Sequence, residues 1–153
     1  ILGIDHVALA VTDIDSSLKV YAALGFSLLD HSEVHGDHSG MRYATLKCKD
    51  ATLVLVQGTS PESQVSRFVA ACGTGIHHIA YAVSDLDAAI HCAQLTGITM
   101  DTPIQSDEGI RQAFLHRDAD TGVRIELIER HGAPFSERNV EGLFRALEAQ
   151  DLY

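Results

Sequence analysis

An internal repeat constrains the fold of this chain more than any other feature. The segment IDHVALAVTDID at residues 4–15 returns as IHHIAYAVSDLD at residues 76–87, and each copy carries a histidine, His6 or His78, at the same point. The two histidines are 72 residues apart, about half of the 153-residue chain. A repeat of this length predicts two copies of one structural module, with the two histidines at equivalent positions.

Length, charge and cysteine content narrow the class of protein. A chain of 153 residues is long enough for a single domain with a buried core. The net charge of −10 and the lack of Lys and Arg clusters argue against nucleic acid and against an anionic membrane as partners. The sequence shows neither a membrane span nor a signal peptide, and its three cysteines lack paired spacing. We therefore expect a cytoplasmic protein with free thiols.

Both halves of the chain show the same order of predicted elements. Apolar alternation, helical spacing and turn residues predict a strand, a helix and three strands in each half, in modules of about 1–60 and 73–131. A linker helix at about 61–72 joins them, and an unrepeated amphipathic helix follows at about 136–150. The fold class is therefore α+β with two βαβββ modules. The predicted strands are 4–11, 26–31, 42–48, 51–57, 76–83, 98–101, 110–116 and 123–129.

Strand alternation gives the repeated strand two unlike faces. One face carries the histidine with small alanines, and the other carries bulky aliphatic side chains that we expect to pack on the helix of the same module. This leaves room above the histidine faces. His77 is expected to point away from its neighbour His78 and to pack beside the site. The histidine faces are Ile4, His6, Ala8 and Ala10 in the first copy and Ile76, His78, Ala80 and Ala82 in the second.

Two imidazoles at equivalent positions near an approximate twofold axis predict a shared metal ion. The best third ligand is Glu126 in RIELIER, because a carboxylate among apolar neighbours on a buried strand needs a partner. Glu129 faces the other way by alternation and is expected at the surface. The alternative is that both histidines are core residues and that Glu126 pairs with Arg124.

The repeat also predicts which position cannot bind the metal. The residue 72 positions before Glu126 is Val54, which has no ligand atom. The predicted site therefore has two histidines, one carboxylate and open positions, a set typical of non-haem Fe(II) sites and also used by catalytic zinc. A slip in the register of this strand would instead bring Gln57 near the ion.

At these residues the chain resembles the vicinal oxygen chelate superfamily, which includes glyoxalase I, methylmalonyl-CoA epimerase, extradiol dioxygenases and 4-hydroxyphenylpyruvate dioxygenase. The resemblance covers nearly the whole chain. It implies paired βαβββ modules that form a cup-shaped mixed sheet around one divalent metal ion, with His6, His78 and Glu126 at the ligand positions. Fe(II) is the favoured ion, and Zn, Co, Mn or Ni are the alternatives.

Two branches of this superfamily resemble different parts of the chain. Residues 97–129 are similar to methylmalonyl-CoA epimerase, although that enzyme has a glutamine ligand in the strand of Val54 and a glutamate base near the position of His38. Residues 63–83 and 129–150 are similar to the dioxygenases that act on hydroxyphenylpyruvate.

The dioxygenase resemblance implies that Gln112 faces the substrate and that the C-terminal helix closes over the metal. On this basis the predicted substrate pocket consists of Phe114, Phe135, Asn139 and Val54.

Three functions follow from this reading. The first is a mononuclear Fe(II) dioxygenase acting on a 2-oxo acid or a similar chelating small molecule, with Gln112 orienting the substrate. The second is an isomerase or lyase in which His38 or Glu108 moves a proton next to a carbonyl. The third is a small-molecule binding protein of the antibiotic-resistance type. His38 lies in the polar segment 33–40, predicted as a loop, and a homodimer is the expected assembly.

Overall fold

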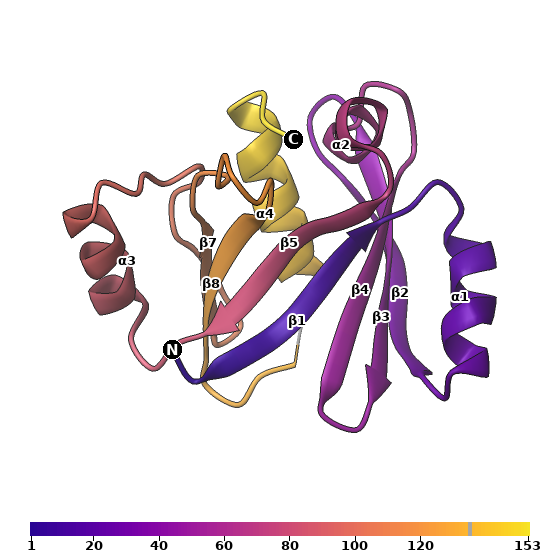
Figure 1. Cartoon of the computed structure of the whole chain (residues 1–153), viewed down its shortest axis with the longest axis horizontal. Helices are drawn as coiled ribbons and strands as arrows, with labels where there is room; N and C mark the ends of the chain where they lie inside the picture. The colour runs from indigo at the N-terminus through magenta and orange to yellow at the C-terminus, as the bar shows by residue number, and fades with distance from the viewer. Residues whose placement is uncertain (135) are drawn as a thin grey trace.

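The computed structural model describes residues 1–134 and 136–153, and their strands form one eight-stranded sheet. The sheet order is β2-β3-β4-β1-β5-β8-β7-β6. Figure 1 shows α1 and α3 at opposite sides of the molecule, with the strands and α4 between them. The strands are β1 (Gly3–Ala10), β2 (Ser27–His35), β3 (Gly40–Cys48), β4 (Ala51–Gly58), β5 (Gly75–Ala82), β6 (Gln105–Asp107), β7 (Ile110–Phe114) and β8 (Arg124–Arg130). The helices are α1 (Ile14–Ala23), α2 (Gln64–Cys72), α3 (Leu86–Leu95) and α4 (Glu137–Ala149).

The strand ladders reproduce the repeat. The first strands of the two halves, β1 and β5, pair antiparallel at the centre of the sheet. Each then pairs in parallel with the last strand of its own half: Ala8 lies opposite Val54, and Ala80 lies opposite Glu126. Because both members of the second pair lie 72 residues after those of the first, the register is the same in both halves. The predicted α+β class with βαβββ modules is confirmed.

The two faces of the sheet pack as the alternation predicted. On the outer face, Leu9 and Val11 pack with Ile14 and Leu18 of α1, and the second half repeats this packing on α3. On the inner face, a second cluster brings strands of the first half together with Phe144 of α4. This inner cluster also contains Ala8, Ala10, Val34, Met41, Tyr43, Val54, Val56, Val65 and Phe68.

Two repeat-related acceptors fix the start of the first helix in each half. The side-chain amide oxygen of Gln57 accepts a hydrogen bond from the Ile14 N–H at 2.9 Å, and the Glu129 carboxylate accepts one from the Leu86 N–H at 2.7 Å. Both contacts satisfy N–H groups that a helix start leaves unpaired. The expected surface position of Glu129 is therefore wrong: its side chain is buried, because α3 needs the acceptor and Arg111 lies 3.4 Å away as counter-ion.

Two predicted segments have different boundaries in the structure. Residues 98–101 contribute only an isolated bridge from Met100 to Leu115, and the corresponding strand is the short β6. The predicted loop 33–40 is shortened to residues 36–39, because Val34 is buried in the inner core and extends β2 to His35 and because β3 begins at Gly40. Within the described residues, no helix is long and apolar enough to span a membrane.

Candidate metal centre

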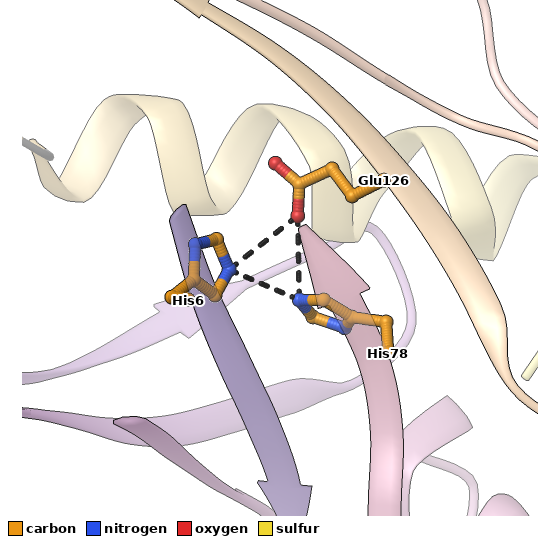
Figure 2. Close-up of side chains that lie close together, drawn as sticks. All are labelled: His6, His78 and Glu126. Atoms are coloured by element: carbon orange, nitrogen blue, oxygen red, sulfur yellow. Dashed lines mark hydrogen bonds and ion pairs between the residues drawn. The ribbon is translucent and has the colours of Figure 1, made fainter. Parts of the chain in front are cut away.

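Three buried side chains from the centre of the sheet converge on one point. His6 lies on β1, His78 on β5 and Glu126 on β8, and Figure 2 shows their polar atoms facing one another. The two Nε2 atoms are 3.2 Å apart. Each also lies close to Glu126 Oε2, at 3.5 Å from His6 and 3.3 Å from His78. The structure thus brings together the three side chains that the repeat singled out, and the register excludes Gln57 from this point.

These distances fit a divalent ion. An ion about 2.1 Å from each ligand atom separates the atoms by roughly 3.0 Å at octahedral angles and 3.4 Å at tetrahedral angles. Two of the observed separations, 3.2 and 3.3 Å, lie within that range, and the third, 3.5 Å, lies just above it. The second carboxylate oxygen, Glu126 Oε1, is buried without a hydrogen-bond partner in the described part of the chain. A carboxylate in that state indicates a binding partner that the protein itself does not supply.

Burial sets the protonation of these groups in the metal-free protein. Burial raises the pKa of Glu126 to about 7, with a smaller contribution in the same direction from Asp5. Burial, together with the guanidinium groups of Arg124 and Arg117, lowers the pKa of His78 to about 3. His78 is therefore neutral at physiological pH, which is the form that binds metals. Arg124 pairs with Asp101 at 2.9 Å, so the predicted alternative pair of Arg124 with Glu126 is wrong.

A β-bulge precedes each ligand histidine. The β1–β5 ladder pairs Ile4 with Tyr81 and then His6 with Ala80, which leaves Asp5 out of register; His77 is left out in the same way on β5. A bulge bends the strand and redirects the side chain of the extra residue. Asp5 Oδ1 lies 2.8 Å from His6 Nδ1, and His77 Nδ1 lies 2.9 Å from His78 Nδ1. The prediction that His77 points away from its neighbour is therefore wrong.

A partly enclosed cavity of about 70 Å³ is lined by the three candidate ligand side chains. Its walls are mainly apolar, and four residues of α4 form one side. The volume holds a small molecule or the head of a larger one, with room for only a few water molecules. The lining consists of His6, Met41, Thr45, Val54, Val56, Gln64, Val65, His77, His78, Gln112, Phe114, Glu126, Val140, Leu143, Phe144 and Leu147.

Two residues of the predicted pocket, Val54 and Phe114, line this cavity, and so does Gln112, which was predicted to face the substrate. The Phe114 ring packs edge-on against His78, with centroids 5.0 Å apart. Gln112 is only 1% exposed and donates from Nε2 to the backbone carbonyl of Asn139 at 2.8 Å. Because its amide nitrogen is used in this way, its unpartnered Oε1 is an acceptor available to a bound molecule.

Gln64 was missed by the sequence analysis. Its side chain lines the cavity and donates to the Phe144 carbonyl of α4 at 2.8 Å, in the same way that Gln112 contacts Asn139. The available signal was a polar residue next to the buried apolar positions Val65 and Phe68 of the linker helix. Because glutamine side chains are mostly exposed, a glutamine on the buried face of a helix indicates a specific contact for that side chain.

Other predicted site residues lie elsewhere. His38 is exposed on the turn between β2 and β3 and does not line the cavity, so its assignment as a catalytic residue is not supported. Glu108 is exposed as well, in the β6–β7 turn. Asn139 is buried, but its side chain caps α4 by accepting from Ser136 and donating to the Asp107 carbonyl. Phe135 lies outside the described residues.

Comparisons with known proteins agree with this architecture. A family model described as the glyoxalase/bleomycin resistance protein/dioxygenase superfamily matches residues 5–114. The uncharacterized protein YqjC of Bacillus subtilis (strain 168) is 26% identical over 137 residues, covering 88% of this chain and 96% of that protein.

Two solved structures show how the whole chain compares. Methylmalonyl-CoA epimerase from Mycobacterium tuberculosis has a TM-score of 0.70 and 32% identity, and the match covers 86% of this chain and 89% of the epimerase. A mutant of 4-hydroxymandelate synthase from Streptomyces coelicolor has a TM-score of 0.85 at 20% identity, and the match covers 97% of this chain but 54% of the synthase. The second likeness concerns the fold alone.

Proposed function

This chain belongs to the glyoxalase/bleomycin resistance protein/dioxygenase superfamily, and we propose that it is a mononuclear non-haem Fe(II) dioxygenase acting on a 2-oxo acid or a similar chelating small molecule. The observation that carries this proposal is the partly enclosed, mainly apolar cavity beside a three-ligand site whose fourth symmetric position is Val54. Two histidines and one carboxylate leave positions open on an ion, as a chelating substrate and dioxygen require.

Each part of the cavity has a role in this proposal. His6, His78 and Glu126 would hold the ion. Iron bound there supplies electrons for dioxygen and polarises the oxygens of the substrate. The apolar walls and α4 exclude water from the reacting atoms. Gln112 Oε1 accepts a hydrogen bond from a donor group of the substrate and so orients it.

With a 2-oxo acid, the reaction consumes one dioxygen for each carbon dioxide released. The bond between the carboxylate and the oxo carbon breaks. One oxygen atom enters the new carboxylate, and the other is inserted into the substrate, so that dioxygen is the only oxidant.

The test is iron analysis of anaerobically purified protein, followed by measurement of dioxygen uptake and carbon dioxide release with a panel of 2-oxo acids. We expect about one iron per chain and equal amounts of dioxygen consumed and carbon dioxide released. Tightly bound zinc, with no uptake after reconstitution with Fe(II), would contradict the proposal. Glu126→Ala serves as the inactive control.

A metal-assisted isomerase is the second candidate, because the methylmalonyl-CoA epimerase from M. tuberculosis is 32% identical to this chain over 86% of its length. The ion would then stabilise an enolate while a base moves the proton. Neither His38 nor Glu108 lines the cavity as a base for this reaction. Deuterium exchange from solvent into methylmalonyl-CoA by the Co(II)-loaded protein would favour this candidate, and no exchange would eliminate it.

The cellular setting belongs to the same proposal. Cys48, Cys72 and Cys92 are free cysteines in the structure, which suits a reducing compartment such as the cytoplasm. We also expect a homodimer, which sedimentation analysis of the metal-loaded protein would test.

A further inference from the structure

We propose that His77 is a ligand-binding residue, held by His78 in the tautomer that carries its proton on Nε2, and that it donates this proton to an oxygen acceptor of the bound molecule. The inference rests on the proposed metal site and adds a specificity-determining residue to it. The molecule recognised carries a carbonyl or carboxylate oxygen that accepts a hydrogen bond from His77 Nε2, beside the proposed metal ligand His78.

The bulge in β5 places the ring of His77 at the cavity. Ala8 pairs with His78 and Leu9 pairs with Ile76, so that His77 has no partner in the ladder. Its side chain is 4% exposed and lines the cavity together with that of His78. Phe68 packs edge-on against the His77 ring with centroids 5.0 Å apart, which limits its rotation.

The contact between the two rings determines the tautomer. His78 Nε2 faces His6 and Glu126, so a metal ion bound there would engage this nitrogen and His78 would carry its proton on Nδ1. His78 Nδ1 lies 2.9 Å from His77 Nδ1, which would therefore accept its hydrogen bond. A neutral His77 ring then carries its proton on Nε2. A ligand histidine in a metal site is commonly held by such a contact through its other nitrogen.

The Nε2–H of His77 has no partner within the protein. In the described part of the chain this nitrogen is buried and unpartnered. The other unpartnered buried atoms on the cavity wall are acceptors: Oε1 of Gln64, Gln112 and Glu126. His77 therefore supplies the donor in a cavity that otherwise offers oxygens, and a bound molecule with an acceptor at this position satisfies it.

The repeat provides an internal comparison. Asp5 occupies the same bulge position in the first half and contacts His6 Nδ1 at 2.8 Å. Its carboxylate is also held by Arg130, with contacts of 2.6 and 2.7 Å, and it does not line the cavity. Asp5 and His77 therefore contact His6 and His78 in equivalent ways. Only His77 lines the cavity, so only His77 can also reach a bound molecule.

The direct test is ¹⁵N NMR of histidine-labelled protein loaded with Zn(II), which distinguishes ring tautomers by their nitrogen shifts and long-range proton couplings. We expect His77 to show a protonated Nε2 and an unprotonated Nδ1. A proton on His77 Nδ1 in the zinc-loaded protein would overturn the inference but leave the metal site intact. Failure of the wild-type protein to bind Zn(II) or Co(II) would instead overturn the proposed function.

The second test uses His77→Phe, His77→Gln and, as a matched control, His91→Phe on the exposed face of α3. Co(II) affinity should fall 10–100-fold in His77→Phe, because His78 Nδ1–H loses its acceptor, and should stay within about threefold in His77→Gln, whose amide can accept and donate. With Co(II) saturating, oxalate affinity should fall at least tenfold in His77→Phe only. Equal oxalate affinity in the wild-type protein and the three variants would overturn the donor role of His77. Matching melting curves would show that the variants are folded.

Discussion

At the scale of single residues, Glu126 makes its own contribution to the pH dependence of the stability of the metal-free protein. Its folded pKa of about 7 lies above the ordinary value of 4.5, so its contribution to stability is fully present below pH 4.5 and is lost as pH rises through 7. Between pH 5 and 8 this loss amounts to about 2–3 kcal/mol. We expect Glu126→Gln to remove that part of the pH dependence in urea unfolding of metal-free protein. An unchanged difference between pH 5 and pH 8 in the variant would contradict the assignment.

Val54 tests the three-ligand geometry. Its place opposite Ala8 is equivalent to that of Glu126 opposite Ala80, so Val54→Gln presents an amide oxygen to the ion. We expect the metal-free variant to be about 1–3 kcal/mol less stable, because the amide is buried without a partner. The loaded variant should bind Co(II) more tightly and lose dioxygen uptake, since a fourth protein ligand occupies an open position. Val56→Gln, on the same wall, should lose stability without gaining metal affinity.

The residues found from sequence and those missed differ for a physical reason. His6, His78 and Glu126 converge because the two halves keep one register, and the repeat in the sequence made that register visible. His77 was placed on the wrong face because strict alternation fails at a bulge, and no residue type near position 77 marks that bulge. Gln64 has no repeat counterpart in the site, so the repeat gave no information about it.

At the scale of secondary-structure elements, the Glu148 carboxylate is one of several groups that attach α4 to the first half. Glu148 accepts hydrogen bonds from the Asp37 N–H at 2.6 Å, the His38 N–H at 3.2 Å and the Ser39 hydroxyl at 2.7 Å. Gly36 lies directly beside it, and a Cβ there would displace the Glu148 carboxylate from this position. The turn between β2 and β3 is therefore shaped around the end of α4.

We expect Glu148→Ala to lower the free energy of unfolding by about 1–2 kcal/mol, because three donors lose a charged acceptor at a partly solvated site. Amide exchange should become faster in the last turns of α4 and stay unchanged in β1 and β5. Arg138→Ala is the control on the same helix, since Arg138 pairs with Glu108 of the β6–β7 turn and not with the β2–β3 turn. Similar exchange rates in the two variants would show that Glu148 does not hold the helix.

The elements themselves were predictable to different degrees. Alternation and helical spacing located α2 and α4 within a few residues, since each has a clear apolar face. The strand expected at 98–101 depends on a pairing with β7 that only one bridge, from Met100 to Leu115, provides. The length of β2 depends on burial of Val34 under the inner cluster. Both outcomes come from tertiary contacts, which the local pattern does not contain.

At the scale of the whole molecule, the candidate metal site joins the two halves of the chain. His6 comes from the first half, His78 and Glu126 come from the second, and the β1–β5 ladder connects them. The inner core also combines residues of the first half with Phe144 of α4. The prediction that residues 1–153 form one domain therefore has a thermodynamic consequence, namely that the two halves should unfold together.

We expect one thermal transition, seen equally by far-UV circular dichroism and by tyrosine fluorescence. A bound ion should raise the melting temperature of this whole transition. Zn(II) at 100 times its dissociation constant stabilises the folded state by about 2.7 kcal/mol. For a chain of this size that raises the melting temperature by about 5–10 °C. His6→Ala and His78→Ala, one from each half, should each abolish the shift, whereas His91→Ala should retain it. Two separate transitions, of which zinc moves only one, would mean that the halves fold independently and that the ion does not bridge them.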